Sequence, residues 1–346
     1  MNLLLAGDVG GTKTQLGLFF LGTDLKSVPT RPALLKERTF ASADYAGLLP
    51  LIAEFFQGQD MDVQGACFAV AGPVREGRAA ITHLPWVVDE GQLASALSLD
   101  RVVLINDLTA IAGAIPWLAP EDLFTLNVGT PDLGGAMAVI APGTGLGEAF
   151  VIRDGDTCRI AASQGGHADF APNTPLEIDL LQYLRAQTGH VSYEDVCSGM
   201  GIRSLYRFLK ETGQSAVPDW FAQQLAAGAD PTPLIIEAAV NTDRSCPVAR
   251  DTLELFLSIL GAEAGNLALK VLATGGVFLG GGIPPRILPA LRKGPFLPSF
   301  FAKGPMAALM SGIPVHVILN PQAALFGAAI YGYERGEIFI LAKHIH

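Results

Sequence analysis

A glycine turn between two short apolar segments opens the sequence and limits how the chain can fold. In LLLAGDVGGTKTQLGLFF, residues 3–20, Gly10 and Gly11 separate two segments that alternate as strands do. The stretch is close to a Walker A loop, but Thr12 occupies the position before Lys13 where that loop has glycine. A Walker A loop also leads into a helix, whereas TQLGLFF is typical of a strand. We therefore expect a β-hairpin with a polar turn.

The same arrangement recurs near the middle of the chain. AMAVIAPGTGLGEAFVI, residues 136–152, predicts a strand, a turn of Gly143, Thr144 and Gly145, and a second strand. It is not a dinucleotide fingerprint, because it reads G-x-G-x-G and a strand follows. Either turn alone is consistent with a simple tight hairpin. Two turns that face each other would instead clamp a polyphosphate through backbone N–H groups and threonine hydroxyls.

A third group of glycines lies near the C-terminus, in TGGVFLGGGIPPR, where Gly275–Gly276 and Gly280–Gly282 flank a short apolar run. Glycines allow the backbone to approach a ligand closely, and this group would suit one face of an adenine ring.

Length and composition indicate a two-domain globular protein acting on a small molecule. The 346 residues exceed one small core, and the net charge of -10, from 33 acidic and 23 basic residues, argues against nucleic-acid or anionic-membrane partners. The four cysteines contain no C-x-x-C pair, which indicates neither a zinc site nor disulfides and suggests a reducing cytosol. The N-terminus lacks the pattern of a signal peptide, and no apolar run reaches the roughly 18 residues of a membrane helix.

The order of elements predicts an α/β fold. We expect strands near 3–7, 14–20, 66–71, 78–82 and 101–105, with helices at 45–58 and 89–98. From about residue 175 the periodicity becomes helical, and PVHVILNPQAALFGAAIYGYERG predicts a final strand and helix.

Polar residues at the ends of apolar segments are the candidates for chemistry. Asn106 and Asp107 close the strand-like run VVLIN and precede a helix. Asp107 is either an N-cap or a base for a hydroxyl nucleophile at the carboxyl end of a strand. Gln164 and His167 surround two glycines and could bind a polyol, whereas Glu194 needs no role beyond interacting with a helix dipole.

Five motifs in order resemble the bacterial glucokinases of the hexokinase/actin-like ATPase superfamily, in the branch without zinc. They are D-x-G-G-T-K, strand-N-D-helix, P-G-T-G-L-G, G-G-H-x-D-F-A-P and G-G-V-x-x-x-G-G-I-x-P-R, and they span nearly the whole chain. The cysteine cluster of the zinc-containing branch is absent from the sequence. The resemblance implies a two-domain actin-like ATPase fold, related to ribonuclease H, with an interdomain cleft. It places a small domain at 1–112 plus 320–346 and a large domain at 113–319.

The resemblance also implies a role for each matching residue. Asp8 would help to hold Mg²⁺ through water, Asp107 would accept the proton of the sugar 6-hydroxyl, and Asn106 would bind the sugar. His167 and Glu194, with Gln164, would contact other ring hydroxyls. The predicted nucleotide-binding residues are Gly10, Gly11, Thr12, Gly143, Thr144, Gly145 and Gly281. The implied activity is ATP-dependent phosphorylation of D-glucose in the cytoplasm, and homodimers are common in the family.

Two residues depart from the family pattern. Gln164 stands where the family has glutamate, and His83 stands where it commonly has asparagine. A hydrogen bond to a neutral group contributes about 1 kcal/mol less than one to a charged group, which corresponds to a five- to tenfold weaker sugar affinity. A kinase for another hexose, or a homologue that binds sugar without catalysis, therefore remains an alternative to a glucokinase.

Overall fold

A computed structural model describes residues 3–20, 32–58, 62–82, 84–155, 157–241, 243–334 and 338–340. Its contacts divide the chain into two compact units. The first contains residues 1–122, 149–162 and 320–346, and the second contains residues 123–148 and 163–319. Residues 113–122 and 149–162 thus group with the first unit, where the sequence placed them in the second domain. The domain assignment itself stays a prediction.

The first unit is built on a five-stranded sheet in the order β3-β2-β1-β4-β7. Its strands are β1 (Leu3–Val9), β2 (Lys13–Phe20), β3 (Ala33–Ala41), β4 (Val63–Val70) and β7 (Val102–Asn106). The predicted opening hairpin is present, with β1 antiparallel to β2 and Val9 opposite Thr14. β4 runs parallel to both β1 and β7, so the carboxyl ends of these three strands share one edge. A small ladder of β5 (Arg78–Ala80) and β6 (Val87–Asp89) follows β4 in the chain.

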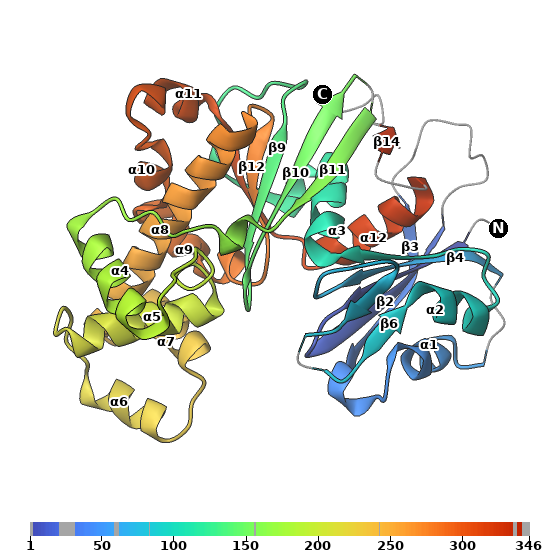
Figure 1. Ribbon diagram of the computed structural model, residues 1–346, viewed down its shortest axis with the longest axis horizontal. Coiled ribbons are helices and arrows are strands. Elements are labelled where there is room, and N and C mark those ends of the chain that lie inside the picture. Colours follow the sequence, from blue (N-terminus) through green and yellow to red (C-terminus); the bar gives the residue numbers. More distant parts are fainter. Residues whose placement is uncertain are drawn as a thin grey trace. The chain divides into compact units, whose positions relative to one another are not determined.

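Helices cover both faces of this sheet (Figure 1). On one face α1 (Leu48–Phe56) and α2 (Glu90–Leu97) pack over Leu3, Leu5 and Phe68. On the other face lie α3 (Asp107–Ala114) and α12 (Ala323–Glu334), which pack against each other, with α12 also contacting β1 and β4. Apolar residues therefore point to both sides of β1, as expected of a strand buried on both faces.

The second unit carries most of a seven-stranded sheet in the order β14-β11-β10-β9-β12-β13-β8. Its strands are β8 (Leu123–Asn127), β9 (Met137–Pro142), β10 (Leu146–Asp154), β11 (Thr157–Ser163), β12 (Gly276–Leu279), β13 (Val315–Ile318) and β14 (Ile338–Ile340). The outer part of the β10–β11 hairpin and β14 belong to the first unit by their contacts. β9, β12 and β13 are parallel neighbours.

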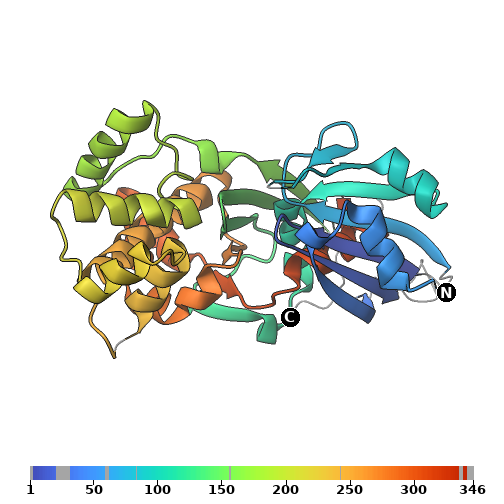
Figure 2. The same ribbon diagram turned by 90° about the horizontal axis from the view of Figure 1, so that it is seen from below.

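The helices of the second unit gather together (Figure 2). They are α4 (Pro175–Thr188), α5 (Gly199–Glu211), α6 (Asp219–Ala226), α7 (Pro231–Val240), α8 (Pro247–Val271), α9 (Leu288–Lys293), α10 (Phe296–Phe301) and α11 (Ala307–Gly312). α8 is central, since α5, α7 and α10 all pack on it. By length and composition alone α8 could cross a membrane, although the sequence predicted no apolar run of that length. However, 72% of its most apolar 18-residue segment is buried inside the protein.

The α/β character predicted from the sequence is confirmed, and the differences have physical causes. The helical stretch from 233 to 272 consists of two helices, since α7 ends at Val240 and Pro247 begins α8. β3 was not predicted, since an edge strand exposed on one side has little apolar alternation. The short helices α9 to α11 were not predicted, because the prolines and glycines around them interrupt the spacing of apolar residues that indicates a helix.

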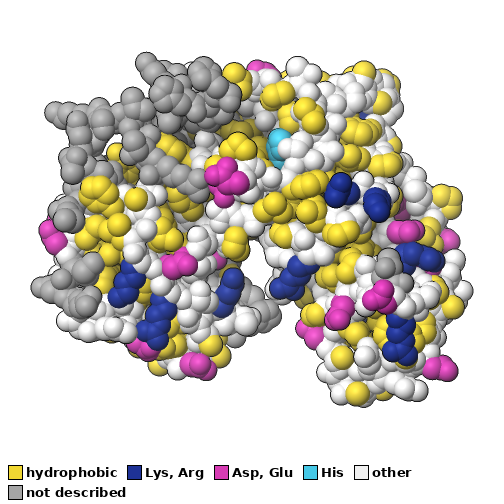
Figure 3. All heavy atoms as spheres, turned by 180° about the vertical axis from the view of Figure 1, so that it is seen from behind, with side chains coloured by type: hydrophobic (Ala, Val, Ile, Leu, Met, Phe, Trp, Pro, Cys, Tyr) yellow, Lys and Arg dark blue, Asp and Glu magenta, His cyan; other side chains and the backbone are white. Residues whose placement is uncertain are grey.

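Charged side chains are mixed on the surface shown in Figure 3. The described Lys and Arg side chains on this face stand singly or in small groups among acidic and apolar ones.

Candidate functional site

The first glycine turn is held in shape by a residue far along the chain. The Gly10 amide donates to the Lys13 carbonyl at 3.0 Å, which closes the hairpin. Ser42, in the 3₁₀ turn Ser42–Asp44, is fully buried beneath it and donates its hydroxyl to the Gly10 carbonyl at 2.8 Å. The Ser42 hydroxyl also lies 2.9 Å from Thr14 Oγ1, and its amide donates to the Thr12 carbonyl. The turn is thus braced from below, while the Thr12 side chain is exposed.

Parallel strand ends bring the predicted catalytic residues to one edge of the first sheet. In the register, Val9 pairs with Val70 and Val70 pairs with Asn106. Neighbouring strands lie about 4.8 Å apart, so β1 and β7 end roughly 10 Å from each other. Asp8 precedes Val9, and Asp107 follows Asn106. The Asp107 charge is close enough to raise the pKa of Asp8.

Asn106 and Asp107 have fixed orientations at the start of α3. The structure makes Asn106 the N-cap, with its Oδ1 accepting from the Leu108 amide at 2.9 Å and its Nδ2 donating to the Gly72 carbonyl. Asp107 is the first helical residue, so the N-cap reading of Asp107 is wrong. Its Oδ1 also accepts from the Leu108 amide. Burial raises the pKa of Asp107, although these hydrogen bonds oppose the rise. A raised pKa makes a carboxylate a stronger base.

Asp8 lies where a cation would stabilise the site. Burial, followed by the Asp107 charge, raises its pKa to about 6, and Lys13 opposes this only partly. Two neighbouring carboxylates with insufficient positive charge form a donor set suited to a hard divalent cation such as Mg²⁺. The residues present therefore fit the ion that the sequence analysis implied.

The second glycine turn connects β9 to β10 and is joined to residues near 194. The Gly143 amide donates to the Gly145 carbonyl at 2.8 Å, and the Gly199 amide donates to the Gly143 carbonyl at 2.8 Å. Glu194 Oε2 accepts from the Leu146 amide at 2.9 Å. A Cβ atom on Gly145 would overlap this same oxygen. A side chain at residue 145 would therefore force the Glu194 carboxylate to shift.

Glu194 also reaches the predicted sugar-binding turn. Its amide donates to the Gly166 carbonyl at 2.7 Å, and its Oε1 lies 4.0 Å from Nδ1 of His167. Glu194 precedes the N-cap of α5, Ser198, by four residues, so the interpretation of Glu194 as a first-turn acid is wrong. The 3₁₀ turn Gly165–His167 presents His167 and the preceding Gln164 on the exposed side.

The glycines near the C-terminus separate into two places. Gly281, with φ of +82°, lies at the carboxyl end of β12, and a Cβ there would be 2.6 Å from the Pro142 carbonyl oxygen. It therefore lies against the start of the Gly143–Gly145 turn. Gly275 is at the opposite end of β12, packed on the backbone of Gly135, and has a structural role. The expected single group of glycines is thus two groups, divided by a strand.

The structure brings most of the predicted residues into two clusters. One cluster, in the first unit, contains Asp8, Gly10, Gly11, Thr12, Asn106 and Asp107, and the other, in the second unit, contains Gly143, Thr144, Gly145, Gln164, His167, Glu194 and Gly281. His83 lies outside the described residues. Sequence reasoning missed Ser42 and the buried Glu148, because neither stands in a motif. The support of a turn from residues far along the chain leaves no local signal.

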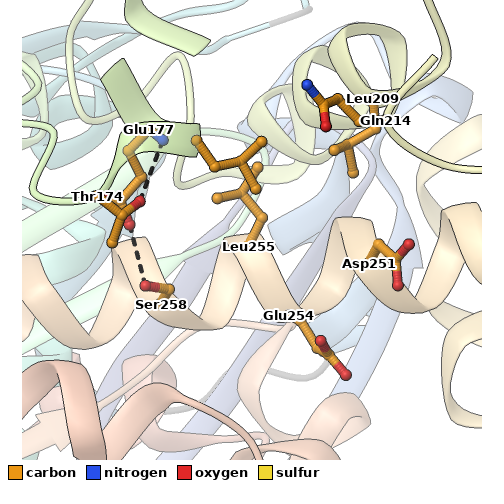
Figure 4. Close-up of a pocket in the computed structure, with 9 residues that line it drawn as sticks. Thr174, Glu177, Leu209, Gln214, Asp251, Glu254, Leu255 and Ser258 are labelled. Carbon is orange, nitrogen blue, oxygen red and sulfur yellow. Dashed lines mark hydrogen bonds between the residues drawn. The ribbon is translucent and has the colours of Figure 1, made fainter. Parts of the chain in front are cut away.

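A separate pocket lies in the second unit (Figure 4). It has a volume of about 310 Å³ and lies between α4, α5 and α8, with Glu177, Asp251, Glu254 and Ser258 in its wall. Ser258 donates to Glu177 Oε1 at 3.0 Å, and the Asn173 amide donates to Oε2, so the buried Glu177 is satisfied. None of the predicted site residues lines this pocket.

Comparison with known proteins places this geometry in a family. The family model described as Glucokinase matches residues 5–335. The chain is 41% identical to a glucokinase of Trichormus variabilis over 95% of its own length and 98% of the relative's. It is 40% identical to a glucokinase of Synechocystis, covering 94% and 96% of the two chains.

Solved structures agree with the sequence comparison. A glucokinase from an Antarctic psychrotroph superposes with a TM-score of 0.78 at 30% identity, covering 95% of this chain and 98% of that one. A ROK family glucokinase from Streptomyces griseus, solved with glucose and AMPPNP, has a TM-score of 0.62 at 22% identity over 96% and 100% of the chains, and shares the fold. The two-domain sugar-kinase fold predicted from the motifs is confirmed. The chain belongs to the glucokinase family.

Proposed function

We propose that this protein transfers the γ-phosphoryl group of ATP to the 6-hydroxyl of D-glucose, giving glucose 6-phosphate and ADP. The observation that carries the proposal is the placement of Asp107 at the carboxyl end of β7, held by the Leu108 amide beside Asn106. Ligands of α/β sheets bind at such strand ends. Membership in the glucokinase family supplies the substrate class.

Asp107 acts as the general base. The hydroxyl oxygen of the sugar attacks the γ-phosphorus while its proton moves to the Asp107 carboxylate, and the bond to the bridging oxygen of ADP breaks. Burial favours the neutral carboxylic acid over the carboxylate, so accepting the proton relieves part of the desolvation. General base catalysis of this kind contributes about 10² to 10⁴ in rate.

The glycine turns supply the phosphate contacts. Phosphoryl transfer depends mainly on positioning and on stabilising the charge of the phosphates. The Gly10–Thr12 turn, rigid through Ser42, and the Gly143–Gly145 turn, fixed through Glu194, both offer backbone N–H groups and a threonine hydroxyl. Gly281, which packs against the start of the second turn, would lie beside the adenosine.

Mg²⁺ would bind near Asp8, through water, and would neutralise charge on the phosphates. The raised pKa of Asp8 supports this assignment, because a carboxylate surrounded by too little positive charge gains most from a cation.

Asn106, Gln164, His167 and Glu194 bind the sugar hydroxyls. A kinase specific for another hexose is the second candidate, and Gln164 is the observation that favours it, since an amide can donate where a carboxylate cannot. We further propose that the protein works in the cytoplasm as a homodimer, with no nucleic-acid or membrane partner, as the family resemblance implies. Light scattering of the purified protein tests the dimer.

A coupled assay of glucose 6-phosphate formation tests the function. Wild-type protein should show turnover that saturates with glucose, and Asp107→Asn, which keeps the shape but removes the base, should lose at least about a hundredfold in kcat. Asp179→Asn, an exposed carboxylate on α4, is the matched control and should retain full activity. Saturating turnover on mannose, fructose or glucosamine but not on glucose would favour the second candidate. Glucose binding without turnover on any sugar would favour a non-catalytic homologue.

A further inference from the structure

Glu148 is a buried carboxyl group for which the proposed reaction has no use. It lies in β10, three residues after Gly145, and only 2% of its surface is exposed. Among the described residues, no hydrogen-bond donor reaches its Oε1 atom. An unpartnered buried acceptor destabilises a fold, so such an atom calls for an explanation.

The group that faces Glu148 is a second carboxyl group, that of Glu263 in α8. Glu263 is fully buried, and its oxygens bond to Asn266 Nδ2 at 2.9 Å and to Lys270 Nζ at 3.3 Å. A side-chain hydrogen bond with Glu263 is one of the causes that raise the pKa of Glu148. Carboxylates only accept hydrogen bonds, so the contact requires a proton on one of them. With that proton on Glu148, the Glu148 carboxyl group becomes a hydrogen-bond donor to Glu263.

The other titratable groups around the pair are two lysines, a tyrosine and a cysteine. Lys303 Nζ, whose pKa is lowered by burial, donates to the Ala262 carbonyl and to Asn266 Oδ1. Burial raises the pKa of the Tyr193 hydroxyl and of the Cys197 thiol, so both stay neutral near pH 7.

The carboxyl group of Glu148 changes protonation near neutral pH. Burial, followed by the charge of Glu263, raises the pKa of Glu148 from 4.5 to about 7, and Lys270 opposes this only in part.

Glu148 is in contact with the turn that carries the sugar-binding residues. Its Oε2 lies against Gly165, so closely that a Cβ on that glycine would overlap the oxygen. The Gly165 amide also donates to Ser163 Oγ at 2.9 Å. Gln164 and His167 flank this contact. A displacement of the Glu148 carboxyl group would therefore move both.

We propose that Glu148 is a positioning residue that shares one proton with Glu263 and thereby holds the turn of Gln164 and His167 in its sugar-binding arrangement. When the proton is lost, two buried carboxylates repel each other, Glu148 shifts against Gly165, and sugar binding weakens. The role rests on the proposed function, because it concerns the affinity of the same sugar site.

The test compares wild type with Glu148→Gln, whose amide permanently replaces the shared proton as a donor to Glu263. The glucose KM of the wild type should rise as pH increases above about 7, by about fivefold between pH 7 and pH 8 for a one-proton linkage. In Glu148→Gln the KM should stay flat over this range, with kcat unchanged. Glu254→Gln is the control for the loss of a charge. Glu254 is an exposed residue on α8, the helix that carries Glu263, and this variant should keep the wild-type pH profile of KM.

A ligand-free measurement separates this inference from the proposed function. Because the folded pKa of Glu148 is raised, the unfolded chain loses this proton first, and the wild type loses stability as pH rises from about 4.5 to 7. The Tm of Glu148→Gln should therefore exceed that of the wild type by an amount that grows over this window and then levels off. If the variant does not fold, Glu263→Gln places the amide on the other member of the pair and should give the same flat KM profile.

Each outcome supports or overturns one of the two claims. If the wild-type enzyme is active and the glucose KM of Glu148→Gln shows the same pH dependence as that of the wild type, the positioning role is overturned. Wild-type protein inactive on glucose at every pH refutes the proposed function, and the positioning of a glucose site with it. A Tm difference that does not change with pH refutes the shared proton in either case.

Discussion

The Leu146 amide donates a hydrogen bond of 2.9 Å to Glu194 Oε2, so a residue predicted to bind sugar holds the turn predicted to bind phosphate. Glu194 Oε1 lies 4.0 Å from His167 Nδ1 on the other side of the carboxylate. One side chain therefore braces two neighbouring turns of the second unit, and a change in either turn should affect both ligands.

Gly145→Ala tests this double role. The new Cβ would overlap Glu194 Oε2, so Glu194 must move away from both turns. We expect the KM values for ATP and for glucose each to rise by roughly tenfold, equivalent to about 1.4 kcal/mol per ligand. Steady-state kinetics measure both constants. Gly143→Ala is the matched comparison, because its Cβ meets no protein atom within 4 Å. It should change the KM for ATP only, and an equal effect of both variants on glucose would argue against the bracing.

Ser42→Ala tests the support of the first glycine turn. The variant loses a partly buried hydrogen bond to the Gly10 carbonyl and a buried one to Thr14 Oγ1. Chemical denaturation should show a free energy of unfolding lower by about 1 to 3 kcal/mol, and the KM for ATP should rise. Ser311→Ala, which removes an exposed hydroxyl bonded within α11, should change stability by no more than about 0.5 kcal/mol. Equal effects of the two changes would contradict a special role for Ser42.

The Mg²⁺ requirement should depend on pH through Asp8. Because the pKa of Asp8 is raised to about 6, its carboxylate is largely protonated below that pH, and the proton competes with the cation. The Mg²⁺ concentration for half-maximal activity should rise as pH falls below about 6, by up to tenfold per pH unit. Titration of activity with MgCl₂ between pH 5 and 8 measures this. Asp8→Asn should require more Mg²⁺ at every pH and lose the dependence; a retained dependence would assign it to another group.

Gln164→Glu restores the carboxylate that the family pattern carries at this position. The side chain is exposed next to His167, so the charge can reach a sugar hydroxyl without a large desolvation cost. We expect the glucose KM to fall five- to tenfold, in line with about 1 kcal/mol gained per charged hydrogen bond. Gln223→Glu, an exposed position on α6, makes the same charge change elsewhere and should have no effect. A glucose KM unchanged by Gln164→Glu would show that the amide already fills the role.

The sequence allowed the turns and strand ends to be predicted because their signals are local. Glycine between alternating apolar segments predicted both hairpins, and the run VVLIN followed by Asp107 predicted a strand that passes into a helix. These patterns reflect backbone geometry within a few residues, which sequence records directly. The N-cap was misassigned by one residue, since Asn106 and Asp107 are both good caps and only the structure separates them.

The parts that sequence reasoning missed depend on residues brought together from far along the chain. Ser42 lies 32 residues from Gly10, and Glu148 and Glu263 belong to a strand and a helix separated by most of the second unit. A buried polar side chain leaves no periodic pattern, and its partners follow from tertiary packing alone. The separation of Gly275 from Gly281 by β12 was missed for a related reason, because sequence proximity does not show which end of a strand a glycine occupies.

The two turns that meet at Glu194 cannot adopt new conformations independently. A ligand that orders the Gly143–Gly145 turn also restrains the turn bearing His167, and the reverse holds through the same carboxylate. Thermodynamic reciprocity then requires that any change that a ligand of one turn makes in the affinity of the other turn's ligand is matched by an equal change in the reverse direction. A nucleotide bound at the Gly143–Gly145 turn and a sugar bound at the turn of His167 would thus be coupled through the carboxylate of Glu194.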